Sequence, residues 1–143
     1  MKSLDELLDL RGADLTSVAA ALDVDPGQRE GITGYQGLED VDAIDAPDGT
    51  RIIARGDALV LVYVGRAALP AGLTSAALVD AVGSAGKALR SRQGKQAQLH
   101  VVAKKGIAWS ESDGEVGFVE IFPPTSFDDY TRDIYVEPAK RVR

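Results

Sequence analysis

The sequence predicts an α+β fold built on an antiparallel sheet, and three observations carry this prediction. With 143 residues, of which 45% are hydrophobic and 27% charged, the chain has the size and composition of one globular domain. Short segments with helical spacing alternate with runs of strand-forming residues. The order of helix and then strands occurs in residues 1–69 and again in residues 70–138. We therefore expect a single domain of two similar halves, followed by a basic tail at residues 139–143.

Two predicted helices open the first half. Ser3 can cap a helix that extends to Leu10, because leucines recur at helical spacing and Ser is a favoured N-cap. A second helix is expected from Leu15 to Leu22, and Asp25-Pro26-Gly27 ends it. Residues 27–38 contain four glycines and no clear period, so we expect a loop there.

Three strands are predicted after this loop. They comprise Val41–Ile44, Arg51–Ala54 and Ala58–Val64. Pro47-Asp48-Gly49 separates the first two and has the turn chemistry that a hairpin needs. We therefore expect a three-stranded meander.

The second half repeats this order. A helix capped by Thr74 or Ser75 stops near Gly83, and a loop spans residues 84–98. The expected strands are Leu99–Ala103, Gly106–Ser110 and Glu115–Phe122. A short closing helix begins at Ser126 and places Phe127, Tyr130 and Ile134 on one side. The halves also align in sequence, because Leu59–Val64 matches Val116–Ile121, and Ile52–Ala54 matches Ile107–Trp109 with a turn two residues longer. We interpret this as a degenerate internal duplication, with the helices on one face of the sheet.

This repeated helix, loop and meander resembles the repeat of BamE-like lipoproteins and of β-lactamase-inhibitor-type proteins. The resemblance covers residues 13–64 and 73–122 and includes the phrases Val79-Asp80-Ala81-Val82-Gly83 and Gly106-Ile107-Ala108-Trp109. The chain lacks the cysteines and the export signal that are usual in those proteins, and no functional residue is carried over. What the resemblance implies is binding of a partner protein in preference to catalysis.

Several function classes are disfavoured by composition. The chain has no cysteine and one histidine, His100, which excludes histidine-based triads and two-histidine metal sites. We expect no cofactor and no metal. The first residues carry charge instead of an apolar signal-peptide core, and the longest apolar run, Ala58–Val64, is far shorter than the roughly 20 residues that span a bilayer. We therefore expect a cytoplasmic protein without a membrane partner.

Charge is distributed unevenly along the chain. The formal net charge is −6, yet residues 1–50 hold twelve acidic and three basic side chains. Between Asp80 and Glu111 there are six basic side chains and no acidic one. The predicted anion-binding residues in this stretch are Lys87, Arg90, Arg92 and Lys95. An equally simple interpretation is that these side chains are solvated or face the acidic first third of the chain.

Both faces of the predicted sheet look apolar. Val60, Val62 and Val64 can face the helices, as can the alternate residues of the last strand. The opposite set consists of Leu59, Leu61, Tyr63, Val116, Phe118 and Glu120. We expect a protein-binding face made of Leu61, Tyr63, Trp109, Phe118 and Glu120. The alternative is that the closing helix of the same chain covers this face.

These observations favour a non-catalytic protein-binding module of the inhibitor, immunity or accessory-subunit type, whose partner is another protein or a second copy of this chain. A first alternative is a small enzyme or small-ligand-binding protein with a pocket around His100, Arg90 and Arg92. A second alternative is an anion or RNA binder that uses the basic segment 87–105. We do not expect nucleic acid to be the main partner.

Overall fold

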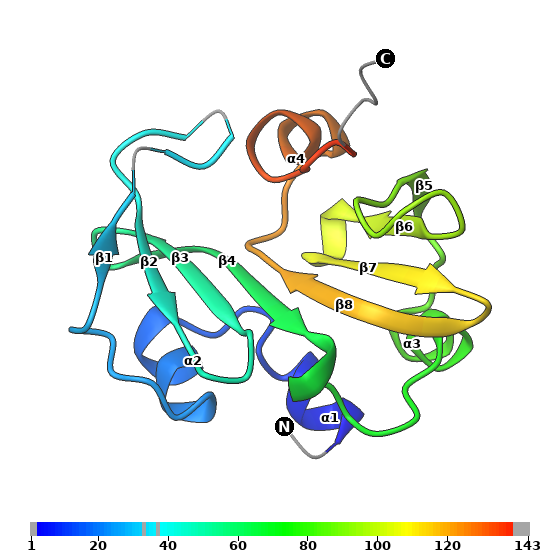
Figure 1. Cartoon of the computed structure of the whole chain (residues 1–143), viewed down its shortest axis with the longest axis horizontal. Helices are drawn as coiled ribbons and strands as arrows, with labels where there is room; N and C mark the ends of the chain where they lie inside the picture. Colours follow the sequence, from blue (N-terminus) through cyan, green and yellow to red (C-terminus); the bar gives the residue numbers. More distant parts are fainter. Residues whose placement is uncertain (1–2, 33, 37, 139–143) are drawn as a thin grey trace.

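One eight-stranded antiparallel sheet organises the chain (Figure 1). The computed structural model describes residues 3–32, 34–36 and 38–138, so the basic tail 139–143 lies outside the described residues. The helices are α1 (Leu4–Leu8), α2 (Leu15–Ala21), α3 (Ser75–Val82) and α4 (Phe127–Asp133). The strands are β1 (Glu30–Gly31), β2 (Asp42–Asp45), β3 (Arg51–Arg55), β4 (Ala58–Gly65), β5 (Lys87–Arg90), β6 (Gln98–Val102), β7 (Ile107–Ser112) and β8 (Glu115–Ile121). The predicted α+β class and antiparallel sheet are confirmed.

The two halves meet through their last strands. The spatial order is β1-β2-β3-β4-β8-β7-β6-β5, so each half supplies one meander, and β4 pairs with β8. Each meander has four strands, and the predicted three-stranded unit is wrong. The missed strands are the two outer ones, because β1 has only two residues and β5 is a charged, mostly exposed edge strand without an apolar run.

Each of the four α-helices begins at a residue whose side chain caps it. In every case the side-chain oxygen accepts a hydrogen bond from the backbone N–H three residues later. The capping residues are Ser3, Asp14, Thr74 and Ser126. Gly83 ends α3 in the left-handed region with φ of 85°. Because these signals are local, the boundaries of α1, α2 and α3 and the start of α4 agree with the predicted ones to within two residues, whereas α4 ends at Asp133, before the predicted stop at Pro138.

A β-bulge interrupts the last strand of each half at the same place. Val60 in β4 and Gly117 in β8 are the extra residues in the pairings with β3 and β7. Each bulge shifts the alternation of side chains by one residue. Leu59 and Val116 therefore pack on the helix side, and Val60 packs on the opposite side, which reverses the predicted facing of all three. The equal positions of the bulges agree with the alignment of Leu59–Val64 with Val116–Ile121.

The preceding strands align differently from the prediction. Ile52 of β3 lies opposite Val62, and Trp109 of β7 lies opposite Val119, so Ile52 is the structural counterpart of Trp109. The β3–β4 and β7–β8 turns have the same length, and the predicted two-residue difference between them is wrong. The sequence alignment, which matched Ile52 with Ile107, is therefore two residues out of register with the structure.

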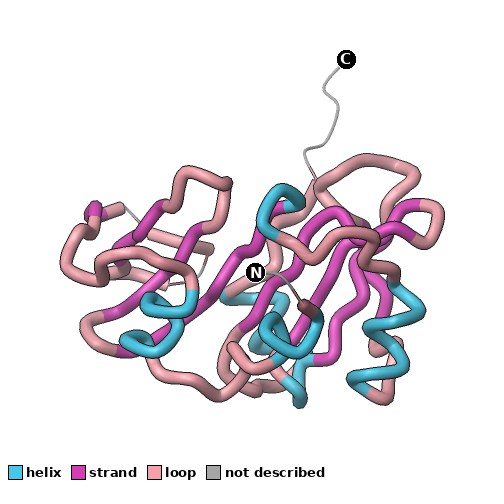
Figure 2. Tube along the Cα trace, turned by 90° about the horizontal axis from the view of Figure 1, so that it is seen from below, coloured by secondary structure: helices cyan, strands magenta, loops and turns pink. Residues whose placement is uncertain are grey.

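Helices α1, α2 and α3 cover one face of the sheet, as predicted (Figure 1). Figure 2 views the molecule from this face, and the helices lie in front of the strands. The core beneath them draws on both halves, because Leu7 and Val18 belong to the same buried cluster as Leu78 and Val119. Trp109 is fully buried in this cluster, and its Nε1 donates a hydrogen bond of 2.9 Å to Ser75 Oγ. Its predicted place on the opposite face is wrong, because the register of β7 turns it toward the helices.

The second face is covered by segments of the same chain. Helix α4 lies over it on the side of the second half (Figure 1), and Tyr130 of this helix is fully buried. Tyr135, just after α4, donates a hydrogen bond to the backbone carbonyl of Arg90 in β5. Over the first half, Tyr35 and Leu38 of the loop before β2 pack on the same cluster. A cavity remains between these two covers.

Candidate functional site

The predicted protein-binding residues do not form an open face. Leu61, Phe118 and Glu120 are on the second face of the sheet, as expected, but each is at most 2% exposed. Trp109 lies on the helix side. Tyr63 is the member of the set that keeps partial exposure. The surface available to a partner is therefore the region around Tyr63.

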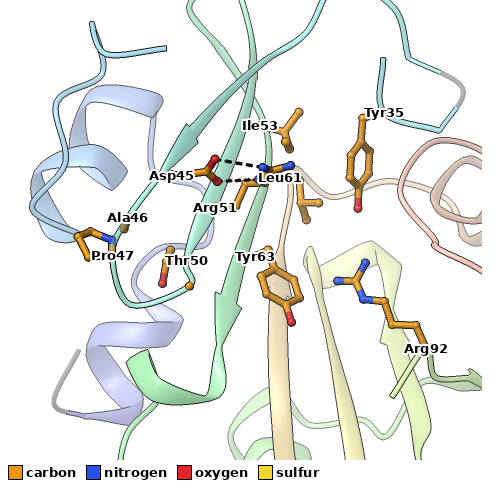
Figure 3. Close-up of a pocket in the computed structure, with 11 residues that line it drawn as sticks. Tyr35, Asp45, Ala46, Pro47, Thr50, Arg51, Ile53, Leu61, Tyr63 and Arg92 are labelled. Atoms are coloured by element: carbon orange, nitrogen blue, oxygen red, sulfur yellow. Dashed lines mark hydrogen bonds and ion pairs between the residues drawn. The ribbon is translucent and has the colours of Figure 1, made fainter. Parts of the chain in front are cut away.

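Tyr63 lines a cavity of about 490 Å³ that is open to solvent at the junction of the two halves. Figure 3 shows its walls, with Arg92 reaching in from the second half and the other side chains supplied by the first half. We call it the seam cavity. Its lining consists of Tyr35, Asp45, Ala46, Pro47, Gly49, Thr50, Arg51, Ile53, Leu61, Tyr63 and Arg92.

The β2–β3 turn builds one wall of the seam cavity. Pro47 and Gly49 form a tight turn in which the Gly49 N–H bonds to the Ala46 carbonyl, and Gly49 has φ of 87°. Asp48 accepts a hydrogen bond from the Thr50 N–H at 3.0 Å. Arg51 follows at the start of β3, directly opposite Tyr63 in the pairing with β4. The turn therefore brings Arg51 and Tyr63 to paired positions in the cavity lining, while the Arg51 guanidinium points to Asp45 (Figure 3).

The opposite wall is held by the loop that follows β5. Ser91 is buried, and its hydroxyl lies 2.7 Å from the hydroxyl of Ser110 and accepts a hydrogen bond from the Gln93 N–H. This anchor fixes the backbone on both sides of Arg92. The Arg92 guanidinium carbon then sits 4.7 Å from the ring centroid of Tyr63 and 4.8 Å from that of Phe118.

Glu120 lies behind Arg92 and is its acidic partner. The two are 3.8 Å apart at their closest nitrogen and oxygen, and Glu120 is 2% exposed. Tyr130 of α4 donates a 2.5 Å hydrogen bond to the other carboxyl oxygen of Glu120. Burial raises the pKa of Glu120 from 4.5 to about 7, and the bond from Tyr130 and the charge of Arg92 only partly oppose the rise. Glu120 therefore gains and loses its proton near neutral pH.

Arg51 and Thr50, two further polar residues of the cavity lining, differ in whether their polar atoms have hydrogen-bond partners. Arg51 holds Asp45 through two hydrogen bonds of 2.6 and 3.0 Å, and this pairing raises the pKa of Arg51. Thr50 is 2% exposed, and its Oγ1 has no hydrogen-bond partner among the described residues. A buried hydroxyl without a partner costs free energy, and this oxygen is too deeply buried for a ligand in the cavity to reach it.

The predicted pocket around His100, Arg90 and Arg92 is not formed. His100 lies outside the seam cavity, with Nε2 2.7 Å from a Glu111 carboxyl oxygen, Nδ1 3.2 Å from the Ala85 carbonyl, and its ring stacked on Trp109. Arg90 is exposed on the edge strand β5. Alternation along a strand would place residues 90 and 92 on the same side, but β5 ends at Arg90 and Arg92 lies in the turn that follows, so the two side chains point differently. Of the three predicted residues, Arg92 alone lines the cavity.

The predicted basic segment is divided among different environments. Lys87 Nζ lies 4.6 Å from the ring centroid of Phe127, and Lys105 Nζ donates a hydrogen bond to the Val82 carbonyl. Arg92 faces the seam cavity, while Arg90 and Lys95 are exposed. The positive side chains that are adjacent in sequence therefore have different neighbours in the fold.

Eight of the eleven residues that line the cavity were missed from sequence, as was the contact of Tyr130 behind them. Tyr35 lies in a glycine-rich loop without a period, and Thr50 and Arg51 look like ordinary turn and strand residues. Tyr130 was expected in the closing helix, but its contact with Glu120 joins segments that only the fold brings together. One signal was visible in advance, namely the isolated Tyr35 within a polar loop.

Within the part of the chain that the structure describes, no cluster of three or more acidic or histidine side chains is arranged to hold a metal ion. None of the helices described is long and apolar enough to cross a membrane. No family model, curated protein or solved structure matches this chain. The resemblance to the BamE-like and inhibitor-type repeats therefore rests on the order of elements alone.

Proposed function

We propose that this chain is a non-catalytic protein-binding module that contacts its partner at the seam cavity. The observation that carries the proposal is the composition of the cavity wall, where Tyr35 and Tyr63 stand beside Arg51 and Arg92. Tyrosine and arginine dominate the energetics of protein interfaces, because each combines a large contact area with directional hydrogen bonds. Inhibitor, immunity and accessory subunits are the classes of protein that this type of site fits.

The positions of the titratable groups support binding over catalysis. His100 is paired with Glu111 away from the seam cavity, and Asp45 is held by Arg51. Glu120 lies under the guanidinium of Arg92, accepts a hydrogen bond from Tyr130 and is shielded from the cavity by burial. Hydrolytic triads require a nucleophile, a base and a group that orients the base, all within hydrogen-bond distance of one another. No such set is assembled among the described residues.

Small-ligand binding is the second candidate function. A volume of about 490 Å³ falls within the range of known ligand pockets, and Arg92 supplies a charged group inside it. The open side of the cavity favours a protruding group of a protein, because a free small ligand usually needs enclosure on most sides. Binding of RNA or another polyanion through residues 87–105 is less favoured, since Lys87 and Lys105 are engaged within the chain and Arg92 faces the seam cavity, away from them. A cytoplasmic location fits a chain without cysteine.

Site-specific photo-crosslinking tests the proposal. A benzophenone amino acid is placed at Pro47, which is exposed on the cavity wall, and in a matched control at Ala20, which is exposed on α2 on the opposite side. In the native host's lysate we expect one protein to be crosslinked from Pro47 and not from Ala20. We expect Tyr63→Ala to abolish this product. Equal products from both positions, or a monomer by light scattering that crosslinks to nothing, would contradict the proposal.

A further inference from the structure

The Arg92 guanidinium has hydrogen-bonding capacity that its surroundings do not use. A guanidinium carries five N–H donors. Among the described residues, its acidic partner is Glu120 at 3.8 Å, a distance too long for a hydrogen bond, and the Tyr35 hydroxyl also interacts with it. The side chain is 29% exposed, toward the seam cavity. Arg92 therefore presents most of its donors to whatever enters the cavity.

Stacking fixes the direction of these donors. The guanidinium lies over the rings of Tyr63 and Phe118 at nearly equal distances, and Phe118 is buried. An arginine held by aromatic rings loses less freedom when it binds a ligand than a solvated arginine does. In Figure 3 its planar group points between Tyr35 and Tyr63. The arrangement suits a planar, two-oxygen acceptor, which a guanidinium binds through two parallel hydrogen bonds.

The charges around the cavity favour a ligand with one negative charge over a ligand with two. Arg51 is neutralised by Asp45, whose carboxylate itself lines the cavity. Arg92 is countered only by Glu120, through a long contact. A phosphate dianion would lack a second free cation and would approach the Asp45 carboxylate. A carboxylate satisfies Arg92 without that excess charge.

Other parts of the lining complete a site for a carboxylate attached to an apolar stem. Tyr35 and Tyr63 flank the Arg92 guanidinium in the cavity wall (Figure 3). Ile53 and Leu61 are the buried apolar members of the lining. Together with the proposed function, on which this step rests, these features lead us to infer that the seam cavity is a carboxylate-binding site that receives an acidic group of the partner protein.

The test uses NMR of the ¹⁵N-labelled chain, with the Arg92 Nε–H signal as the readout. The probes are N-acetylglutamic acid amide, which carries a side-chain carboxylate, and N-acetylleucine, which carries a C-terminal one. N-acetylglutamine amide is the neutral control, and inorganic phosphate is the dianion. We expect a saturable shift with at least one carboxylate at a Kd on the order of 1 mM, and little response to the other two probes. The carboxylate that binds more tightly identifies the source.

Matched variants separate the role of Arg92 from that of general charge. Arg92→Gln should weaken the binding of the carboxylate at least tenfold, whereas Arg90→Gln, two residues away and outside the cavity, should leave it unchanged. If Arg92→Gln does not fold, Arg92→Lys provides the test, with an expected loss of roughly threefold to tenfold, because an ammonium cannot make the two parallel hydrogen bonds of a guanidinium. Equal binding of the neutral amide, tighter binding of phosphate, or equal loss in both arginine variants would overturn the inference.

The outcomes also distinguish this inference from the proposed function. A protein crosslinked from Pro47 with no binding of either carboxylate would refute the carboxylate site and leave the binding module standing. Carboxylate binding without any crosslinked protein would refute the protein-binding function and assign the cavity to a small carboxylic acid.

Discussion

The buried carboxyl of Glu120 makes the stability of this protein depend on pH in a way that one substitution reveals. Its pKa is about 7 in the folded chain, above the ordinary value of 4.5. Between these values the folded state keeps a proton that the unfolded chain has released. The free energy of unfolding contributed by this group is therefore fully present below pH 4.5 and is lost as the pH rises through 7. Glu120→Gln removes this dependence while keeping an oxygen that accepts the Tyr130 bond.

The size of the effect follows from the two pKa values. At 1.36 kcal/mol for each pH unit, a rise from 4.5 to about 7 corresponds to about 3 kcal/mol, of which about 2 to 3 kcal/mol falls between pH 5 and pH 8. The unfolding free energy of Glu120→Gln minus that of the wild type should increase by this amount over that interval. Urea unfolding followed by the fluorescence of Trp109, which is the single tryptophan, measures it.

Glu115→Gln is the control for this experiment, because Glu115 is on the same strand but its side chain is 68% exposed. Its stability curve should run close to that of the wild type at both pH values. If the curve of Glu120→Gln also runs parallel to that of the wild type, then Glu120 does not titrate as a buried group, and the network of Arg92, Glu120 and Tyr130 is assigned wrongly.

Two further substitutions test the fold. Gly106→Ala should destabilise the protein by more than about 2 kcal/mol, because Gly106 has φ of 68° and an added Cβ would collide with the Phe122 carbonyl. The control is Gly114→Ala, where φ is 80° and the space around the Cβ is open, so this variant should cost only the backbone strain of about 1 kcal/mol. Equal losses of stability in urea unfolding would disprove the close approach at Gly106. Trp109→Phe should cost about 2 to 3 kcal/mol, because it removes buried volume and the bond to Ser75, and a loss below about 0.5 kcal/mol would contradict the burial of Trp109 in the helix-side core.

Local signals explain why much of the fold was predictable. Helix caps such as Ser3 and Thr74 act within one turn, and the apolar run of β4 identifies a strand by itself. The facing of residues was not predictable to the same degree. The bulges at Val60 and Gly117 depend on pairing with a neighbouring strand, and each one shifts the side-chain alternation by one residue.

The candidate site was only partly predictable because it is assembled from distant segments. Tyr63 and Arg92 were singled out from sequence for separate reasons, one as a member of an apolar face and the other as part of a basic stretch. Their contact arises because β4 pairs with β8, which brings the loop after β5 over the first half. Thr50 carries no pattern that marks it before the turn is in place, and the isolation of Tyr35 in a polar loop does not say which strand it will cover.

Photo-crosslinking from the cavity wall tests the central claim most directly. With the benzophenone group at Pro47, the account predicts one crosslinked protein that disappears in Tyr63→Ala and is missing when the group is at Ala20. A crosslinked product that survives Tyr63→Ala, or that forms equally from Ala20 on the helix face, would contradict the assignment of the seam cavity as the site where this chain meets its partner.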